Sequence, residues 1–163
     1  MSRTDRAAAS FDTGHDHRHC LRGALDRAAA LCRERGVRLT PLRRRVLELV
    51  WGGHRPLGAY DILAALQAER SGAAPPTVYR ALDFLRSHGL VHRIESRNSF
   101  VGCPDPDTPH GGQFLICRTC GQAAELNDKA VDEAIRSSAA RAGFVIAART
   151  IEIEGECPNC RRD

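Results

Sequence analysis

Two short cysteine pairs constrain the fold of this 163-residue chain more than any other feature. Cys117 and Cys120 form one pair, Cys157 and Cys160 form the other, and two residues separate the thiols within each pair. A turn of this kind lets two thiolates bind one ion, and two such turns complete the tetrahedral four-cysteine set of a structural zinc. A redox CxxC or four unrelated cysteines are the alternatives, but a thioredoxin-like motif needs only one pair. The spacing therefore predicts a structural zinc that joins the two ends of a small β-α-β unit.

The remaining composition favours a protein of the reducing cytoplasm. No apolar run approaches the roughly 20 residues that span a bilayer, and residues 1–16 lack the apolar core of a signal peptide. We therefore expect a cytoplasmic chain with no membrane partner, in which paired cysteines bind metal instead of forming disulfides. The net charge of +4 permits nucleic-acid binding without requiring it, but the arginines cluster in the N-terminal half and the acids toward the C-terminus. This asymmetry indicates a basic N-terminal half that faces phosphate.

Apolar periodicity predicts a winged helix-turn-helix domain over residues 19–103. Residues 1–18 are small, polar and charged without periodicity, and we expect them to be a disordered tail. Thr40-Pro41 and Pro75-Pro76 are typical helix starts, and Gly36 and Gly89 are typical helix ends. Two strand-like runs separated by a polar turn then form the hairpin, or wing. The predicted helices cover 21–36, 41–51, 59–71 and 75–88, and the strands cover 90–95 and 99–103.

The sequence pattern of the second half of the chain predicts a smaller domain that contains both helix and strand. A hinge rich in Pro, Gly and Asp covers 104–112, and the domain follows over 113–163. This segment is too short to build a large core by itself, so the metal is expected to hold it together. The whole fold is then α+β, a winged-helix DNA-binding domain followed by a small α/β dimerisation domain stapled by the four-cysteine zinc. Its predicted strands are 113–117, 123–126 and 144–154, with a helix over 128–142.

The helix predicted at 75–88 has the pattern of a DNA-recognition helix. Val78, Leu82 and Leu85 face inward at i, i+4 and i+7. A helix-turn-helix presents the first turns of its second helix to the base edges, and arginine suits bidentate contact with guanine. Exposed polar residues also occur on helices that bind nothing, but the arginine asymmetry favours DNA contact. The candidate contacts are Thr77, Tyr79 and Arg80, with Tyr60 of the preceding helix reaching a phosphate.

A second set of metal-binding side chains surrounds the hinge. A two-residue turn at 97–98 would place His92 directly opposite Cys103 across the wing hairpin. His110 in the hinge and Glu125 after the first CxxC would complete a set suited to tetrahedral zinc. Each residue also has an ordinary alternative, such as a solvated histidine, a buried thiol or a surface acid. An ion bound by all four would fix the orientation of the two domains.

Three stretches of the sequence resemble the ferric uptake regulator family, and specifically its zinc uptake regulator branch. They are Val37-Arg38-Leu39-Thr40-Pro41-Leu42-Arg43, Pro76-Thr77-Val78-Tyr79-Arg80-Ala81-Leu82-Asp83-Phe84-Leu85, and Gly89-Leu90-Val91-His92-Arg93-Ile94-Glu95-Ser96 continuing to Cys103, with Phe114-Leu115-Ile116-Cys117 further on. The resemblance covers about residues 21–160. It implies a homodimer, a four-cysteine structural zinc, and a regulatory zinc held by His92, Cys103, His110 and Glu125. It also implies metal-activated repression of zinc uptake genes at AT-rich palindromes, with two zinc ions per monomer and no small-molecule substrate.

Two departures and two rival functions remain open at this point. The stretch from Cys103 to His110 is slightly shorter than in close relatives, and the segment with His15, His17, His19 and Cys20 could hold an extra metal. An iron or peroxide sensor of the same architecture is one rival, although Gly111-Gly112-Gln113-Phe114 lacks the His-Asp-His cluster of those sensors. A zinc hydrolase with Glu125 as base is the other. Nothing in the sequence supports a substrate pocket, so we expect no enzyme.

Overall fold

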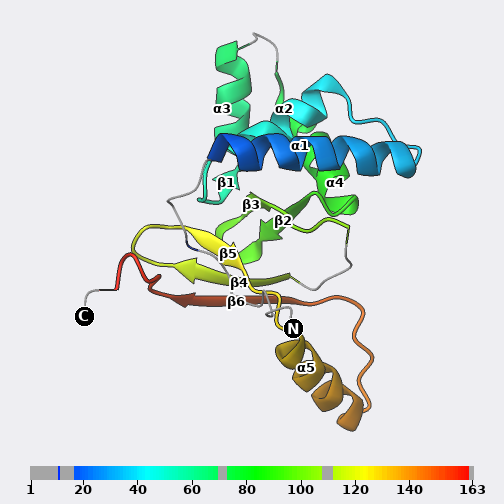
Figure 1. Cartoon of the computed structure of the whole chain (residues 1–163), viewed down its shortest axis with the longest axis vertical. Helices are drawn as coiled ribbons and strands as arrows, with labels where there is room; N and C mark the ends of the chain where they lie inside the picture. Colours follow the sequence, from blue (N-terminus) through cyan, green and yellow to red (C-terminus); the bar gives the residue numbers. More distant parts are fainter. Residues whose placement is uncertain (1–10, 12–16, 70–72, 108–111, 162–163) are drawn as a thin grey trace, which may run out of the picture. The chain divides into compact units, whose positions relative to one another are not determined.

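The computed structural model describes residue 11 and residues 17–69, 73–107 and 112–161. The chain divides into two compact units, Asp12–Thr108 and Pro109–Asp163, and the second unit also takes in Phe11, whose carbonyl accepts a 2.8 Å hydrogen bond from Asn159 Nδ2. Helix and strand are mixed along the chain (Figure 1). Among the described residues, no helix combines the length and the apolar character that crossing a membrane would require.

Four helices of the unit Asp12–Thr108 form where the sequence places them. They are α1 (His17–Glu34), α2 (Pro41–Val50), α3 (Ala59–Glu69) and α4 (Pro75–Ser87). Thr40 caps α2, since its side chain accepts a 3.4 Å hydrogen bond from the Arg43 N–H, with Pro41 in the first turn. α1 begins at His17, four residues earlier than predicted, so His17 and Arg18 are helical although they were assigned to a disordered tail over 1–18. The polar start of α1 carries no apolar periodicity that could have shown this.

The sheet of this unit has three antiparallel strands in the order β1-β3-β2. Their bounds are β1 (Leu57–Gly58), β2 (Val91–Ile94) and β3 (Ser99–Gly102). β1 was not predicted, because two residues are too few to show alternation. The wing turn also differs from prediction, since a 3-10 turn (Glu95–Arg97) and a left-handed Asn98 (φ 45°) connect the strands in place of a two-residue turn at 97–98. Asn tolerates this conformation better than most residues.

The apolar stripes of all four helices meet in one core. Leu85, Ile62 and Val46 are fully buried, and the α1 stripe reaches this core through Ala28 and Cys32. Cys32 is 3% exposed, as expected for a small core residue. This core places α4 with one side inward and the other on the surface.

The second unit has a three-stranded sheet in the order β5-β4-β6, with one helix. Its elements are β4 (Gly112–Cys117), β5 (Ala123–Glu125), α5 (Lys129–Arg141) and β6 (Thr150–Gly155). β5 pairs antiparallel with β4, whereas β6 runs parallel to β4, and α5 lies in the crossover that a parallel pair requires. Asp128 caps α5 by accepting a 2.7 Å hydrogen bond from the Ala130 N–H.

The last strand is shorter than the predicted 144–154. β6 starts at Thr150, which pairs with Gly112, the first residue of β4. Residues 144–149 are irregular in the structure, although their apolar character suggested a strand. Phe144 and Val145 lie in this irregular segment and are 67% and 87% exposed.

Candidate metal and nucleic-acid sites

The parallel pairing of β4 and β6 brings the two CxxC turns together. Cys117 is the last residue of β4 and stands opposite Gly155, the last residue of β6, so both turns leave the same end of the sheet. The Arg118 N–H donates to the Gly155 carbonyl at 2.9 Å and ties the first turn to the second strand. Gly121 closes the first turn with φ 76°, a conformation that other residues seldom adopt. The backbone pairing of β4 and β6 thus brings both cysteine pairs to one place.

The four thiols have the spacing of a tetrahedral site. The Sγ atoms of Cys117, Cys120, Cys157 and Cys160 all lie within 4.8 Å of one another, and those of Cys120 and Cys157 are 3.8 Å apart. A zinc ion with bonds of about 2.3 Å to four sulfurs gives sulfur–sulfur edges of about 3.8 Å. These residues therefore fit a zinc ion. The arrangement brings together all four ligands that the sequence predicted for a structural zinc.

The thiols of Cys117 and Cys160 have pKa values that are shifted in opposite directions. Backbone N–H groups of Cys120 and Cys157, at 3.5 and 3.4 Å from Cys117 Sγ, lower the pKa of the Cys117 thiol to about 6. A hydrogen bond with Cys157, with burial and the neighbouring sulfurs, raises the pKa of Cys160 to about 12. The pKa values of the two thiols thus move in opposite directions, because backbone N–H groups favour the Cys117 thiolate whereas hydrogen bonding and burial favour the protonated form of Cys160. Only a cation at the centre lets all four thiolates coexist.

The surface of α4 presents the predicted DNA contacts to solvent. Val78, Leu82 and Leu85 are 1% exposed or less, as predicted. Thr77, Tyr79 and Arg80 lie on the exposed side, and Tyr60 at the start of α3 is 72% exposed. Large aromatic side chains exposed to this degree are common at binding surfaces.

Two further residues line a hollow beside Arg80 that sequence reasoning did not assign to DNA contact. Thr40 and Arg43 at the start of α2 face Thr77 and Arg80 across a hollow of about 210 Å³. Arg43 also stacks on Phe84 at 3.6 Å from the ring centroid and donates to the Arg38 carbonyl at 2.7 Å. These contacts hold its charge beside α4. The signal in the sequence was the arginine at the start of a helix, next to a hydroxyl cap.

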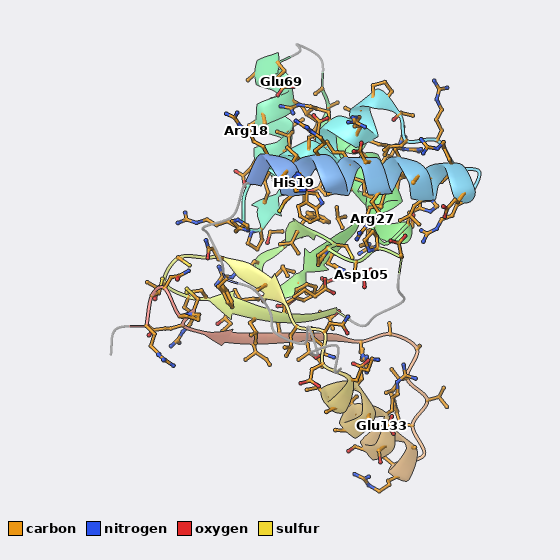
Figure 2. All side chains as sticks on the ribbon, in the orientation of Figure 1. Arg18, His19, Arg27, Glu69, Asp105 and Glu133 are labelled. Carbon is orange, nitrogen blue, oxygen red and sulfur yellow. The ribbon has the colours of Figure 1, made fainter. Side chains whose placement is uncertain are left out.

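Arg44 and Arg45, which follow Arg43 in the sequence, form ion pairs with glutamates. Arg45 forms a bidentate pair with Glu69 and a 2.8 Å contact with Glu48, and Arg44 lies 3.4 Å from Glu48. Figure 2 labels Glu69 at the end of α3. The hydrogen bonds to Glu69 and Glu48 raise the pKa of Arg45 above its usual range. Of these three successive arginines, Arg43 is the one that lines the hollow beside α4.

The wing brings His92 and Cys103 together, but not directly opposite each other. His92 pairs with Val101, and the Cys103 N–H donates to the Leu90 carbonyl at 3.0 Å. The four-residue turn thus shifts the register by two residues from the predicted pairing. An even shift keeps both side chains on one face of the hairpin, and a His92 ring nitrogen lies within 4.8 Å of Cys103 Sγ. The structure therefore forms the ligand pair on a diagonal.

The other two members of the second metal set come from other segments of the chain. Glu125 ends β5 in the second unit, opposite Phe114, and is half-buried. His110 lies outside the described residues, as does His15 of the N-terminal histidine segment. His19 and Cys20 are in the first turn of α1, and no third metal-binding side chain of the described chain joins them. The full hinge set and the extra N-terminal site therefore stay predictions.

The chain is similar in sequence and structure to known metal-dependent and peroxide-responsive regulators. The zinc uptake regulation protein of Escherichia coli (strain K12) is 42% identical over 137 residues, which are 83% of this chain and 80% of that protein. A solved structure of a zinc uptake regulator complexed with zinc and DNA is 40% identical, with a TM-score of 0.81, and covers 85% of this chain and 93% of that one. The peroxide operon regulator of Bacillus subtilis (strain 168) is 31% identical over 143 residues, which are 85% of this chain and 94% of that protein.

A family model agrees with these similarities. The model described as the ferric uptake regulator family matches residues 34–154, a range that includes the recognition helix, the wing and the first cysteine pair. Its last residue lies in β6, directly before the second cysteine pair. The chain therefore belongs to the ferric uptake regulator family.

Proposed function

We propose that this protein is a zinc-responsive transcriptional repressor that binds the operators of zinc uptake genes when its regulatory zinc site is filled. One observation carries the proposal: the His92–Cys103 ligand pair is built into the wing of the same unit that presents Arg80 on its recognition helix. Metal binding at the wing is then physically linked to the part of the chain that contacts DNA. The similarity to zinc uptake regulators, one of them solved with zinc and DNA, supports this reading.

The DNA contact that we propose centres on the start of α4. Arg80 would contact a guanine edge, and Thr77 and Tyr79 would contact neighbouring bases or phosphates. Tyr60 of α3 would bind a phosphate. The hollow beside Arg80 adds Thr40 and Arg43 as phosphate contacts. The operator would be an AT-rich palindrome in double-stranded DNA.

A structural zinc would be held by Cys117, Cys120, Cys157 and Cys160. The ion would neutralise the four thiolates and link the ends of β4 and β6. It would leave no open coordination position for a substrate, so we assign it no catalytic role. This site would stay filled whether or not the protein is bound to DNA.

A regulatory zinc would be held by His92, Cys103, His110 and Glu125, giving two zinc ions per monomer. These ligands come from both sides of residues 104–111, so an ion bound by all four would restrain the connection between the units. Full switching between two states needs about 10⁴-fold preference of the metal for one of them. Four ligands offer more of that preference than His92 and Cys103 alone.

A homodimer in the cytoplasm is the form in which we expect the protein to act. Phe144, Val145 and Ile153 are large apolar side chains that are 67%, 87% and 48% exposed. α5 has no buried residue, and its side chains, Glu133 among them, project outward along its length (Figure 2). A second copy covering these groups would bury them, and the dimer would place two recognition helices about 34 Å apart, one DNA turn.

The test is a titration of DNA binding against buffered free zinc, using fluorescence anisotropy and a palindromic duplex. Wild type is expected to gain affinity as zinc rises, and Cys103→Ser is expected to lose that dependence. Cys32→Ala is the matched control, a buried core cysteine that belongs to none of the candidate metal sites. An unchanged zinc response in Cys103→Ser would remove this thiol from the sensing site. A requirement for iron, or release from DNA by peroxide with zinc present, would favour the iron- or peroxide-sensing alternative.

A further inference from the structure

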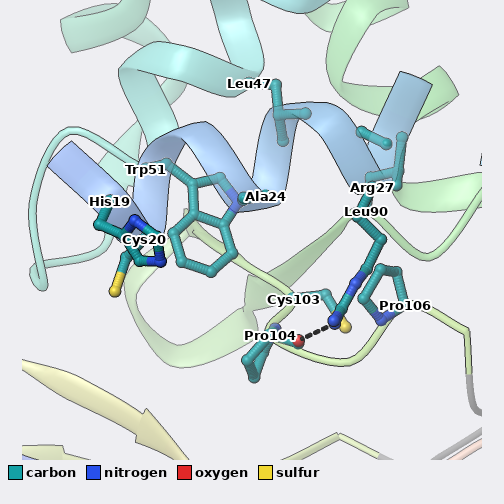
Figure 3. Close-up of a pocket in the computed structure, with 12 residues that line it drawn as sticks. His19, Cys20, Ala24, Arg27, Leu47, Trp51, Leu90, Cys103, Pro104 and Pro106 are labelled. Atoms are coloured by element: carbon teal, nitrogen blue, oxygen red, sulfur yellow. Dashed lines mark hydrogen bonds between the residues drawn. The ribbon is translucent and has the colours of Figure 1, made fainter. Parts of the chain in front are cut away.

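We propose that Arg27 and Trp51 are positioning residues for the regulatory metal, because they fix the backbone on either side of the ligand Cys103. The inference rests on the proposed function in that Cys103 is taken as a zinc ligand. It adds residues from α1 and from the end of α2, neither of which offers a ligand to that ion. Figure 3 shows both side chains beside Cys103 in one cavity of about 320 Å³.

Trp51 lies against the residue that precedes Cys103. A Cβ atom added at Gly102 would meet the indole Cε2 and Nε1 at 2.2 Å, far inside van der Waals contact. The indole ring therefore lies directly on the Gly102 backbone, and any side chain at this position would have to displace it. Gly102 is also held from the other strand, since it pairs with Val91 in the sheet. Its position is consequently fixed from two directions.

Arg27 holds the residues that follow Cys103. Its Nη1 donates a 2.9 Å hydrogen bond to the Pro104 carbonyl, drawn as the dashed line in Figure 3. Its Nε lies 3.5 Å from an Asp107 carboxylate oxygen. Pro104 itself limits the backbone of Cys103 to extended conformations. One arginine of α1 thus anchors the first residues of the connecting segment.

Together these contacts leave the Cys103 thiol little freedom. Its N–H is bonded to the Leu90 carbonyl, and the residue is 3% exposed. A ligand held in this way loses little conformational entropy when it binds an ion. Outer contacts that orient a metal ligand typically contribute about 10- to 100-fold in metal affinity. Because α2 also packs against α4, the segment that fixes Cys103 and the recognition helix share one scaffold.

Arg27→Met and Arg35→Met form a matched pair that tests this role. Arg35 is also on the surface of the unit Asp12–Thr108, directly after α1, and its Nη1 donates a 2.7 Å hydrogen bond to the His88 carbonyl, after α4, and not to the residues that follow Cys103. The full-length protein, loaded with zinc at the four-cysteine site, is titrated with Co²⁺, whose thiolate absorption reports the Cys103 bond. Arg27→Met is expected to weaken Co²⁺ binding about tenfold, and Arg35→Met is expected to leave it unchanged. Gly102→Ala, which drives a methyl group into Trp51, is expected to weaken it further.

Hydrogen exchange gives a second readout that needs no regulatory metal. With only the four-cysteine site filled, the Cys103 amide is expected to exchange faster in Arg27→Met than in Arg35→Met. Equal Co²⁺ affinity and equal exchange in the two variants would overturn the positioning role while leaving the proposed function intact. If wild type and Cys103→Ser show the same Co²⁺ spectrum, Cys103 is no ligand, and the regulatory site of the proposed function fails instead.

Discussion

The unit Asp12–Thr108 buries one continuous apolar cluster drawn from four helices and its sheet, whereas the unit Pro109–Asp163 buries few large side chains, chiefly Phe114 and Ile116. In the second unit two of the buried residues are cysteines of the proposed zinc site, Cys117 and Cys157, and α5 buries nothing. The first unit is therefore stabilised mainly by burial of apolar surface. The second has too little of that surface, and we expect the proposed zinc ion and the proposed partner chain to supply the missing stability.

Loss of the four-cysteine site should produce the largest difference between the units. Cys157→Ser is expected to unfold the second unit, because structural zinc contributes on the order of 10–16 kcal/mol in small domains at neutral pH. The first unit should stay folded. Circular dichroism measures total helix and strand, and the fluorescence of Trp51, the one tryptophan of the chain, reports the first unit. Cys20→Ser is the control. If Cys157→Ser also changed the Trp51 fluorescence to that of unfolded protein, the two units would not be stabilised independently.

A cavity in the apolar core should destabilise the first unit and leave the zinc site of the second unit unchanged. Leu85 is 0% exposed, and Leu85→Ala is expected to cost about 2–5 kcal/mol of unfolding free energy, since contacts are lost and a void remains. Urea denaturation followed by Trp51 fluorescence should detect this loss in the first unit. Zinc content measured by a colorimetric chelator after denaturation should not change. A drop in zinc at the four-cysteine site would mean that the two units are not independent.

Removing a proposed DNA contact should leave both units folded. Arg80→Ala is expected to weaken binding to the operator by about 1–3 kcal/mol, the value of a bidentate contact with a base. Arg45→Ala is the matched control, because Arg45 is paired with Glu69 and Glu48 and faces no proposed base contact. Equal losses of affinity in the two variants, at one salt concentration, would assign Arg80 to general electrostatic attraction.

Acid pH should produce the smallest effect, confined to the second unit. Asp132 of α5 pairs with Arg149 before β6 and also accepts a hydrogen bond from Gln113 Nε2, and these contacts, Arg149 first, lower the pKa of its carboxyl group. The pair therefore stabilises the fold fully above the ordinary pKa of the carboxyl, and this contribution is lost as pH falls through the lowered value. Thermal denaturation of Asp132→Asn should show a weaker pH dependence than wild type between the ordinary and the lowered pKa of this carboxyl group, and an unchanged slope there would contradict this assignment.

Sequence reasoning succeeded where a residue type is required by local geometry. Thr40-Pro41 predicted the start of α2, Val78, Leu82 and Leu85 predicted the inward side of α4, and the cysteine spacing predicted four thiols that do gather. It failed where the bounds or the register of a strand depend on residues elsewhere in the chain. The start of β6 depends on where β4 begins, and the wing register depends on a left-handed Asn98 that no apolar pattern reveals.

The candidate sites also contain residues that local sequence predicts and residues whose position depends on tertiary packing. The pairing of Arg45 with Glu69 could not be read from the sequence, because it depends on the packing of α2 against α3, whereas Glu48 lies within α2, one turn from Arg44. Thr40 and Arg43 were visible as a helix start and a basic residue, yet their position beside Arg80 is a tertiary fact. Spacing predicts ligands that share a turn, such as Cys117 and Cys120, better than ligands that must meet across separate segments.

The parallel pairing of β4 with β6 has a consequence for synthesis of the protein. The two cysteine turns meet although 40 residues separate Cys117 from Cys157, so the ribosome must release almost the whole second unit before the ion can have all four sulfurs. A nascent or prematurely terminated chain that lacks the second cysteine pair would keep only Cys117 and Cys120, which cannot complete a four-cysteine site. If the site binds zinc as proposed, its completion would require translation through Cys160, and chains truncated before that residue would be exposed to proteolysis as unfolded protein.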